Sequence, residues 1–119
     1  MMYQVVNPAT GKVESEYPTA TDAEISEVLA RAARGYTSWR RTSMEERAGI
    51  LRRVSQLYLD RADELAAIIT REMGKVTKAA LGELRFAAAI YQYYADNGAA
   101  LLKDEPLASN LPGDRKSVV

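Results

Sequence analysis

Three acidic side chains are spaced so that they could bind one hard metal cation. Asp60, Asp63 and Glu64 fall at positions i, i+3 and i+4, which would place them on one side of a single helix. The same residues are typical of the charged start of a helix, and this second interpretation is favoured. The chain has no Cys and no His. It therefore cannot supply a thiol nucleophile, a thiolate zinc site, an imidazole base or a Ser-His-Asp triad.

Three tyrosines are the other group with possible chemistry. Tyr91, Tyr93 and Tyr94 could form a stacking platform for a base or a sugar. Position 91 continues an apolar helical stripe, so packing in a core is the favoured interpretation, with Tyr93 the most exposed of the three. The seven glycines are never closer than eight residues apart in the sequence. This spacing argues against a glycine-rich loop that binds phosphate.

The charge balance argues against a nucleic-acid or membrane partner. The 119 residues contain 16 Lys or Arg and 16 Asp or Glu, so the formal net charge is zero. Nucleic acids and anionic membranes both bind clustered positive charge. No apolar run approaches the ~18 residues of a membrane span, and residues 1–5 lack the features of a signal peptide. A cytoplasmic location is expected.

The elements that must position these side chains begin with a predicted β-hairpin. Residues 3–6 are strand-like, residues 7–12 (Asn-Pro-Ala-Thr-Gly-Lys) have strong turn chemistry, and residues 13–17 alternate with a period of two. Pro18 ends the hairpin because it cannot donate a ladder hydrogen bond. A hairpin of this size is marginally stable alone.

The first predicted helix begins at a capping box and ends near residue 39. The box consists of Thr21 and Glu24, which can satisfy each other's free amide groups. Behind it, apolar side chains recur on one face at helical spacing: Ile25, Val28, Leu29, Ala32, Tyr36 and Trp39.

The helical pattern then continues in further segments. Ser43 and Glu46 form a second capping box, and the apolar face that follows runs to Gly74, which suits a left-handed helix end. The charged residues at 60–63 are typical of a helix start. They predict that residues 43–74 form two helices, which meet near these positions. The last helix runs from Thr77 to about Leu102, and its apolar stripe contains Leu81, Leu84, Ala88, Tyr91 and Ala95.

The final residues change in character. Residues 104–114 have loop chemistry, and residues 115–119 are the beginning of a strand that has no ladder partner in the chain. The sequence therefore predicts a mainly α chain with an N-terminal β-hairpin and an unpaired strand at its end.

Five sequence strings carry a resemblance to a known family. They are the turn at 7–12, Ala32 with Trp39, Arg47 with Ile-Leu-Arg at 50–52, Glu-Met-Gly-Lys at 72–75, and Tyr-Tyr-Ala-Asp at 93–96. In order and spacing they resemble the N-terminal quarter of the NAD(P)-dependent aldehyde dehydrogenase superfamily, from Val5 to about Leu107. The strings at 94–97 and 101–106 are most similar to those of bacterial succinate-semialdehyde dehydrogenases.

The resemblance implies an oxidoreductase with an α/β fold that oxidises an aldehyde to a carboxylate. In the family a Cys forms a thiohemiacetal, hydride passes to NAD or NADP, and a Glu assists hydrolysis of the thioester. That Cys, that Glu, the oxyanion Asn and the cofactor-binding glycines belong to parts of the family chain beyond Val119. The chain alone is therefore expected to be inactive and to bind no cofactor, whereas the complete enzyme would be a homo-oligomer that binds an aldehyde substrate.

A few family roles fall on residues of this chain. The helix that ends in Tyr93-Tyr94 lines the mouth of the substrate tunnel in relatives. Phe86 matches a position that faces this tunnel, with Ile90 nearby, and ordinary core packing of Phe86 is the alternative. Some relatives also hold a monovalent cation with the backbone around Val6 and an acid that matches Glu72; oxygen donors of this kind suit a hard cation.

The resemblance also implies a division of the chain. Residues 1–18 form the hairpin, residues 19–102 a helical segment of the cofactor-binding domain, and residues 103–119 a loop with the start of a truncated bridging or oligomerisation strand. The apolar helix faces should then lack a complete partner. The alternative is a stand-alone helical interaction or oligomerisation module without catalysis, in which the same stripes form a closed bundle or a dimer seam.

Overall fold

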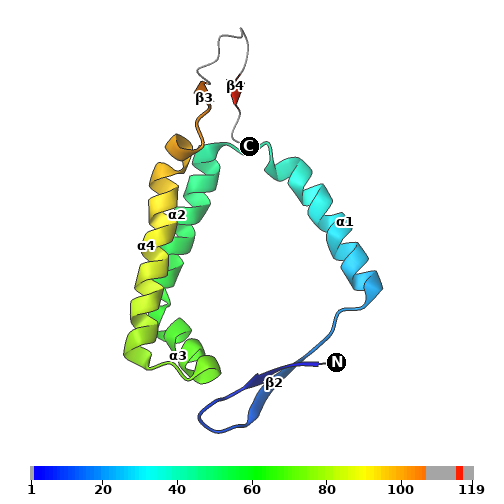
Figure 1. The fold of residues 1–119 in the computed structure, drawn as a ribbon, viewed down its shortest axis with the longest axis vertical. Coiled ribbons are helices and arrows are strands. Elements are labelled where there is room, and N and C mark those ends of the chain that lie inside the picture. Colours follow the sequence, from blue (N-terminus) through cyan, green and yellow to red (C-terminus); the bar gives the residue numbers. More distant parts are fainter. Residues whose placement is uncertain (1, 107–114, 117–119) are drawn as a thin grey trace.

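The computed structural model describes residues 2–106 and 115–116, which form a hairpin, a series of helices and a short second ladder (Figure 1). The elements in chain order are β1 (Met2–Val6), β2 (Val13–Pro18), α1 (Asp22–Trp39), α2 (Met44–Asp60), α3 (Ala62–Met73), α4 (Thr77–Leu101), β3 (Glu105–Pro106) and β4 (Arg115–Lys116). The predicted mainly α architecture with an N-terminal hairpin is confirmed.

The hairpin is an antiparallel pair whose turn is closed by Asn7. Tyr3 lies opposite Tyr17, and the register shifts between Val5 and Val6. The Asn7 carbonyl accepts hydrogen bonds from the amides of Thr10 and Gly11 at 3.3 and 2.8 Å. Gly11 has a φ of +67°, a conformation that glycine adopts without steric cost.

Both predicted capping boxes are present. The Thr21 hydroxyl accepts a hydrogen bond from the Glu24 amide at 3.3 Å, and the Glu24 carboxylate accepts one from the Thr21 amide at 2.7 Å. Ser43 and Glu46 make the same pair of bonds at 3.1 and 2.7 Å. Hydrogen bonds from the cap residue's amide and hydroxyl lower the pKa of each Glu, because they favour the ionised carboxylate. These boxes fix where α1 and α2 begin.

The core lies where α4 packs along α2 and α3 (Figure 1). It is built mostly from small side chains, and the buried residues are Ala48, Ser55, Ala66, Ala80, Leu84, Ala88 and Ala95. The Ser55 hydroxyl donates a hydrogen bond to the Ala88 carbonyl at 2.9 Å across the α2–α4 interface. Small side chains allow the two helices to approach closely. The predicted break between α2 and α3 and the predicted α4 stripe are both confirmed.

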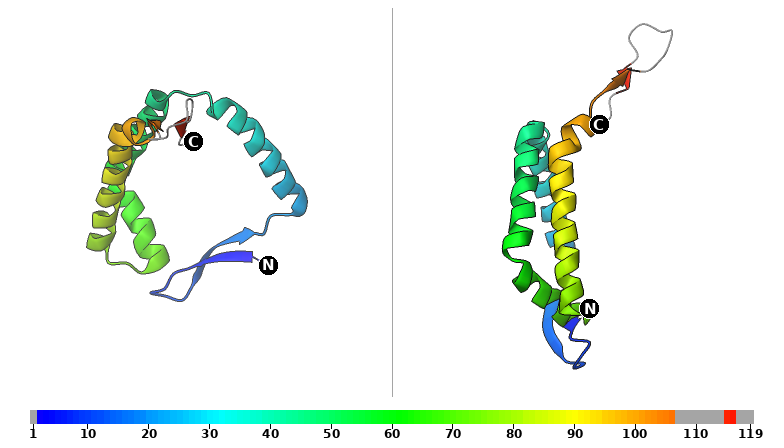
Figure 2. Two further views of the ribbon diagram at one scale, coloured as in Figure 1. Left: turned by 45° about the horizontal axis from the view of Figure 1, so that its top comes forward. Right: turned by 90° about the vertical axis from the view of Figure 1, so that its left-hand side faces the viewer.

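Helix α1 lies apart from this core and has no buried residue. It is joined to α2 through Arg47, which donates a hydrogen bond to the Trp39 carbonyl at 3.1 Å and lies 5.3 Å from the centre of the Trp39 ring. The hairpin meets the end of α3 through an ion pair between Arg71 and Glu14 at 3.0 Å. The hairpin, α1, α2 and α3 thus form an open frame, visible in Figure 1 and in the left view of Figure 2.

The radius of gyration reflects this open arrangement. It is 20.6 Å, whereas a compact chain of this length would have a radius of gyration of about 13.5 Å. The apolar face of α1 therefore lacks a partner in the described part of the chain, as the sequence predicts.

The prediction for the last residues is partly wrong. Glu105 and Pro106 form a strand, where a loop was predicted, and they pair antiparallel with Lys116 and Arg115. The strand at 115–116 is therefore not an orphan. The turn-forming residues around Pro106 predict a loop, but proline is tolerated in a strand at a sheet edge. Residues 107–114 and 117–119 of the predicted loop and strand lie outside the described residues.

Gly74→Ala should weaken the junction between the hairpin and α3. Gly74 ends α3 with a φ of +68°, and an added Cβ would lie 2.9 Å from Pro8 Cγ. Gly11→Ala is the matched control, because Gly11 has nearly the same φ with nothing within 4 Å of the added Cβ. We expect Gly11→Ala to lower the free energy of unfolding by about 1 kcal/mol and Gly74→Ala by about 2 kcal/mol. Thermal melts followed by circular dichroism test this. If the two variants lose the same free energy of unfolding, the contact with Pro8 does not contribute to stability.

Candidate functional site

The two predicted tunnel residues lie one turn apart on α4. Phe86 is 68% exposed and Ile90 is 40% exposed. Together with Ala89, Tyr93 and Tyr94 they line a shallow, open pocket of about 350 Å³. Phe86 is therefore not part of the core that the described residues form. The structure brings Phe86 and Ile90 into one apolar and aromatic surface, which we call the α4 ridge (Phe86, Ala89, Ile90, Tyr93 and Tyr94).

The three tyrosines of α4 divide into two groups. Tyr91 is half-buried and packs against Tyr58 of α2, with 5.4 Å between ring centres. Side-chain hydrogen bonding with Tyr91 raises the pKa of Tyr58. Tyr93 and Tyr94 are both exposed and contact each other edge to face at 5.3 Å. The packing interpretation is thus confirmed for Tyr91. Tyr94 is 53% exposed and lines a pocket on each side, one with Phe86 and Ile90 and one with residues of α2.

Asp60, at the end of α2, and Glu64, in the first turn of α3, each contact a neighbouring side chain. Gln56 donates a hydrogen bond to Asp60 at 2.8 Å, and Arg61 forms an ion pair with Glu64 at 2.6 Å. Hydrogen bonding with Arg61 lowers the pKa of Glu64. Among residues 2–106 and 115–116, no group of three or more carboxylates is arranged to hold a metal ion. The charged helix start is therefore the better account of these acids.

Within the parts of the chain that the structure describes, no helix is both long and apolar enough to cross a lipid bilayer.

The predicted cation residues lie on the two sides of the junction between the hairpin and α3. Val6 is the last residue of β1, and Glu72 is in the last turn of α3. Between these elements, the Arg71 guanidinium contacts Glu14 at 3.0 Å and Glu72 at 3.3 Å. Two carboxylates share one guanidinium, so these three side chains carry one net negative charge.

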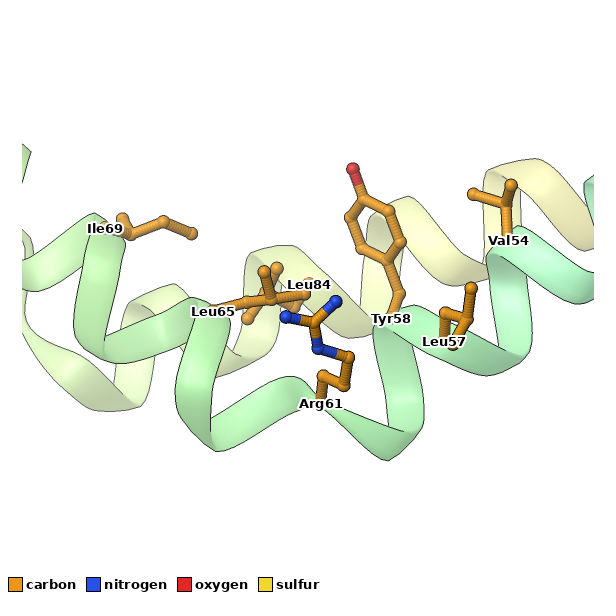
Figure 3. A pocket seen from close by; sticks show the side chains of 7 residues that line it. All are labelled: Val54, Leu57, Tyr58, Arg61, Leu65, Ile69 and Leu84. Carbon is orange, nitrogen blue, oxygen red and sulfur yellow. The ribbon is translucent and has the colours of Figure 1, made fainter.

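An apolar groove that sequence reasoning missed lies where α2 meets α3. It has a volume of about 390 Å³. Figure 3 shows the Arg61 side chain beside it, and its apolar and aromatic lining consists of Val54, Leu57, Tyr58, Leu65, Ile69 and Leu84. The signal in the sequence is the apolar face of α2 and α3, but the groove depends on the break at residue 61, which turns the two faces toward each other.

Known proteins resemble this chain over nearly its whole length. The family model for the aldehyde dehydrogenase family matches residues 1–119. Succinate-semialdehyde dehydrogenase (NADP(+)) of Deinococcus radiodurans is 39% identical over 117 residues, which are 98% of this chain and 24% of that protein. The corresponding protein 1 of Mycobacterium tuberculosis is 41% identical over 106 residues, 89% of this chain and 23% of that protein.

Solved structures give the same result. The crystal structure of succinic semialdehyde dehydrogenase from Streptococcus pyogenes, in complex with NADP+, superposes with a TM-score of 0.84 at 35% identity. The match covers 91% of this chain and 24% of that one. The chain thus spans about a quarter of the length of these relatives. Because the family model covers every residue and the backbone follows that of solved members, this chain belongs to the aldehyde dehydrogenase family.

Proposed function

We propose that this chain is the N-terminal part of an NAD(P)-dependent aldehyde dehydrogenase that oxidises succinate semialdehyde. The observation that carries the proposal is the 39% identity, over 117 residues, to a deinococcal enzyme named for this aldehyde and for NADP(+). The complete enzyme would be a cytoplasmic homo-oligomer that uses NAD or NADP.

The contribution of this chain would be to shape the entrance for the aldehyde. The chain has no Cys, so the nucleophile must come from another part of the polypeptide. Bound NAD or NADP would accept the hydride, but the dispersed glycines of this chain do not fit a phosphate cradle, and we assign no cofactor contact to it. Phe86 and Ile90 on the α4 ridge would form an apolar wall for the carbon chain of the substrate.

The proposal includes the domain division inferred from the sequence. Residues 1–18 would be the hairpin, residues 19–102 a helical segment of the cofactor-binding domain, and residues 103–119 the start of a bridging or oligomerisation element. The exposed apolar face of α1 supports a larger domain around the helices. The β3–β4 ladder, which extends beyond the end of α4 in Figure 2, supports a separate role for the last segment.

A monovalent cation beside Val6 and Glu72 is a further part of the proposal. The net negative charge of Glu14, Arg71 and Glu72 supports a cation at this junction. If it binds there, replacing potassium chloride by choline chloride at equal ionic strength should lower the thermal midpoint of the chain. Glu72→Gln should abolish this difference, and a midpoint that is the same in both salts would contradict the site.

A chimera made as one continuous polypeptide tests the proposed function. Residues 1–119 replace the matching quarter of the D. radiodurans enzyme, and formation of NADPH is measured with succinate semialdehyde and NADP+. We expect a rate within about tenfold of the parent enzyme, because segments with 39% identity share the family's packing pattern. The 119-residue chain alone should show no turnover above the rate without protein.

The controls separate the proposal from its alternative. A chimera that folds but oxidises no aldehyde would refute the proposed function. Turnover by the isolated chain would show that a nucleophile other than Cys acts within it. The stand-alone interaction module predicts that the isolated chain is a compact particle that does not bind a hydrophobic dye, whereas a part of a larger enzyme should bind the dye.

A further inference from the structure

Ser55 is the one buried polar residue in the described part of the chain. It is 5% exposed, and its hydroxyl donates a hydrogen bond to the Ala88 carbonyl at 2.9 Å. Serine and threonine within a helix often bond a carbonyl one turn earlier in the same helix. Thr37 and Ser38 of α1 do so, at 3.2 and 2.9 Å. Ser55 instead bonds a residue 33 positions later, and so links α2 to α4.

The packing around this bond leaves the position of α4 weakly defined. The buried side chains at the interface are small on both helices, with Ala48 on α2 and Ala88 and Ala95 on α4. Methyl groups give a helix face little relief, so shape alone resists rotation or sliding of α4 along α2 only slightly. A buried hydrogen bond is directional, and one buried polar group can fix the register of two packed helices.

The other polar links between α2 and α4 lie at the edge of the interface. Arg52 is 3.7 Å from Asp96, and both side chains are exposed, so this ion pair is weak. Tyr58 and Tyr91 are half-buried and contact each other through their side chains. Side chains can follow a small movement of a helix by rotating. Ser55 binds the backbone of α4 itself, which cannot adjust in this way.

Ala88 lies between the two proposed tunnel residues in the sequence. Phe86 and Ile90 are each two positions away from it, which places them about 160° around the helix. The bond with Ser55 therefore holds one side of α4, and the opposite side carries the α4 ridge. A rotation of α4 by about 20° would move the ridge side chains by about 2 Å. Misplacements of about 1 Å are sufficient to change the rate of an enzyme.

We propose that Ser55 is a positioning residue for aldehyde selectivity. By bonding the Ala88 carbonyl, it fixes the rotation and register of α4, and thereby the place of Phe86 and Ile90 in the substrate entrance. The proposal rests on the proposed function. It deepens that function by naming a buried residue, on another helix than the α4 ridge, that determines which aldehydes fit.

Ser55→Ala in the chimera tests the effect on selectivity. The measured quantity is the ratio of kcat/KM for succinate semialdehyde to that for a bulkier aromatic aldehyde. We expect this ratio to fall about threefold, less than the roughly tenfold effect of removing an apolar wall, and the KM for NADP+ to stay within about twofold. In a Phe86→Ala background, Ser55→Ala should change the ratio by less than about 1.5-fold, because two residues that act through one contact are not additive.

Ala66→Gly is the control for a general loss of stability. Ala66 is buried on α3 against Ala80 and Leu84, and it is not part of the α2–α4 interface. The variant should lower the thermal midpoint of the 119-residue chain by about 6 °C, because it removes a buried methyl group and adds a glycine within a helix. Ser55→Ala should lower the midpoint by only about 2 °C, because alanine favours the helix and offsets part of the lost bond. Ala66→Gly should nevertheless leave the ratio of aldehydes unchanged.

A distance measurement tests the position of α4 without enzyme activity. The chain has no Cys, so nitroxide labels can be attached specifically at Arg53→Cys on α2 and Arg85→Cys on α4, which are exposed positions. We expect one narrow distribution of distances between the labels in the 119-residue chain and in its Ala66→Gly variant. In Ser55→Ala the distribution should shift or broaden by about 2 Å.

Three outcomes would overturn the proposal. The distances between the labels could be the same with and without the Ser55 hydroxyl, which would show that the bond does not fix α4. Ser55→Ala could change the ratio of aldehydes equally in the parent and Phe86→Ala backgrounds, so that it would not act through the tunnel wall. Ala66→Gly could change the ratio as much as Ser55→Ala, which would assign the effect to stability. A folded parent chimera without activity would refute the proposed function alone, since the label distances still report on Ser55.

Discussion

Ala88→Leu should unfold the isolated chain at a much lower temperature than its neighbouring variant Ala89→Leu. Ala88 is 2% exposed and lies on α4 where it meets α2. Its carbonyl accepts the Ser55 hydroxyl at 2.9 Å, so the two helices are in close contact at this point. The larger side chain has no space between them and would push α4 away from α2. The cost should be about 3 kcal/mol, from overpacking together with the loss of the Ser55 hydrogen bond.

This cost is large for a chain with so small a core. Apart from Leu84 and Ser55, the buried residues in the described part of the chain are alanines, so little apolar surface is removed from water there. At roughly 4 °C or more per kcal/mol, the thermal midpoint should fall by about 12 °C. Ala89 is exposed, and its replacement by leucine should shift the free energy of unfolding by less than about 0.5 kcal/mol. Similar midpoints for the two variants would show that α2 and α4 are not packed as described.

Local signals in the sequence were sufficient to predict the helices. The capping boxes at Thr21 and Ser43 act within four residues, so their chemistry is complete in the sequence itself. The same is true of Gly74, whose left-handed conformation ends α3. The apolar stripe of α4 also gave the correct buried face, because helical periodicity alone determines which residues share a side.

Features that depend on contacts between distant residues could not be predicted in the same way. Hydrophobic pattern marked Ala88 as apolar, but nothing local pairs it with Ser55, which is 33 residues earlier in the chain. The pairing of β3 with β4 was missed because a proline at the edge of a ladder gives the same signal as a proline in a loop. The open frame has no local signal either, since the face of α1 resembles that of any buried amphipathic helix.

The candidate site shows the same distinction. The positions of Phe86 and Ile90 one turn apart follow from helix geometry, whereas their assignment to a tunnel came from the family resemblance. The sequence did not predict that Tyr94 belongs to the α4 ridge, because the exposure of its side chain depends on which side of α4 meets α2.

Phe86→Ala in the chimera should change the selectivity for aldehydes more than the affinity for NADP+. Phe86 is the most exposed of the large side chains on the α4 ridge, and its removal opens the pocket that it lines with Ile90 and Tyr93. Removal of an apolar wall from a substrate entrance changes discrimination between substrates by about tenfold. We expect the ratio of kcat/KM for succinate semialdehyde to that for a bulkier aromatic aldehyde to fall by this factor, while the KM for NADP+ stays within twofold.

The variant should leave the fold intact, which makes the kinetic result interpretable. Phe86 contributes little to the core because two thirds of its surface is exposed in the described chain. Arg85→Ala is the matched control, since Arg85 is exposed on the same turn of α4 but does not line the pocket. If Phe86→Ala raises the KM for NADP+ and leaves the ratio of aldehydes unchanged, Phe86 does not line the tunnel. If Arg85→Ala changes the ratio equally, the effect comes from a displacement of α4 as a whole and not from the aromatic wall.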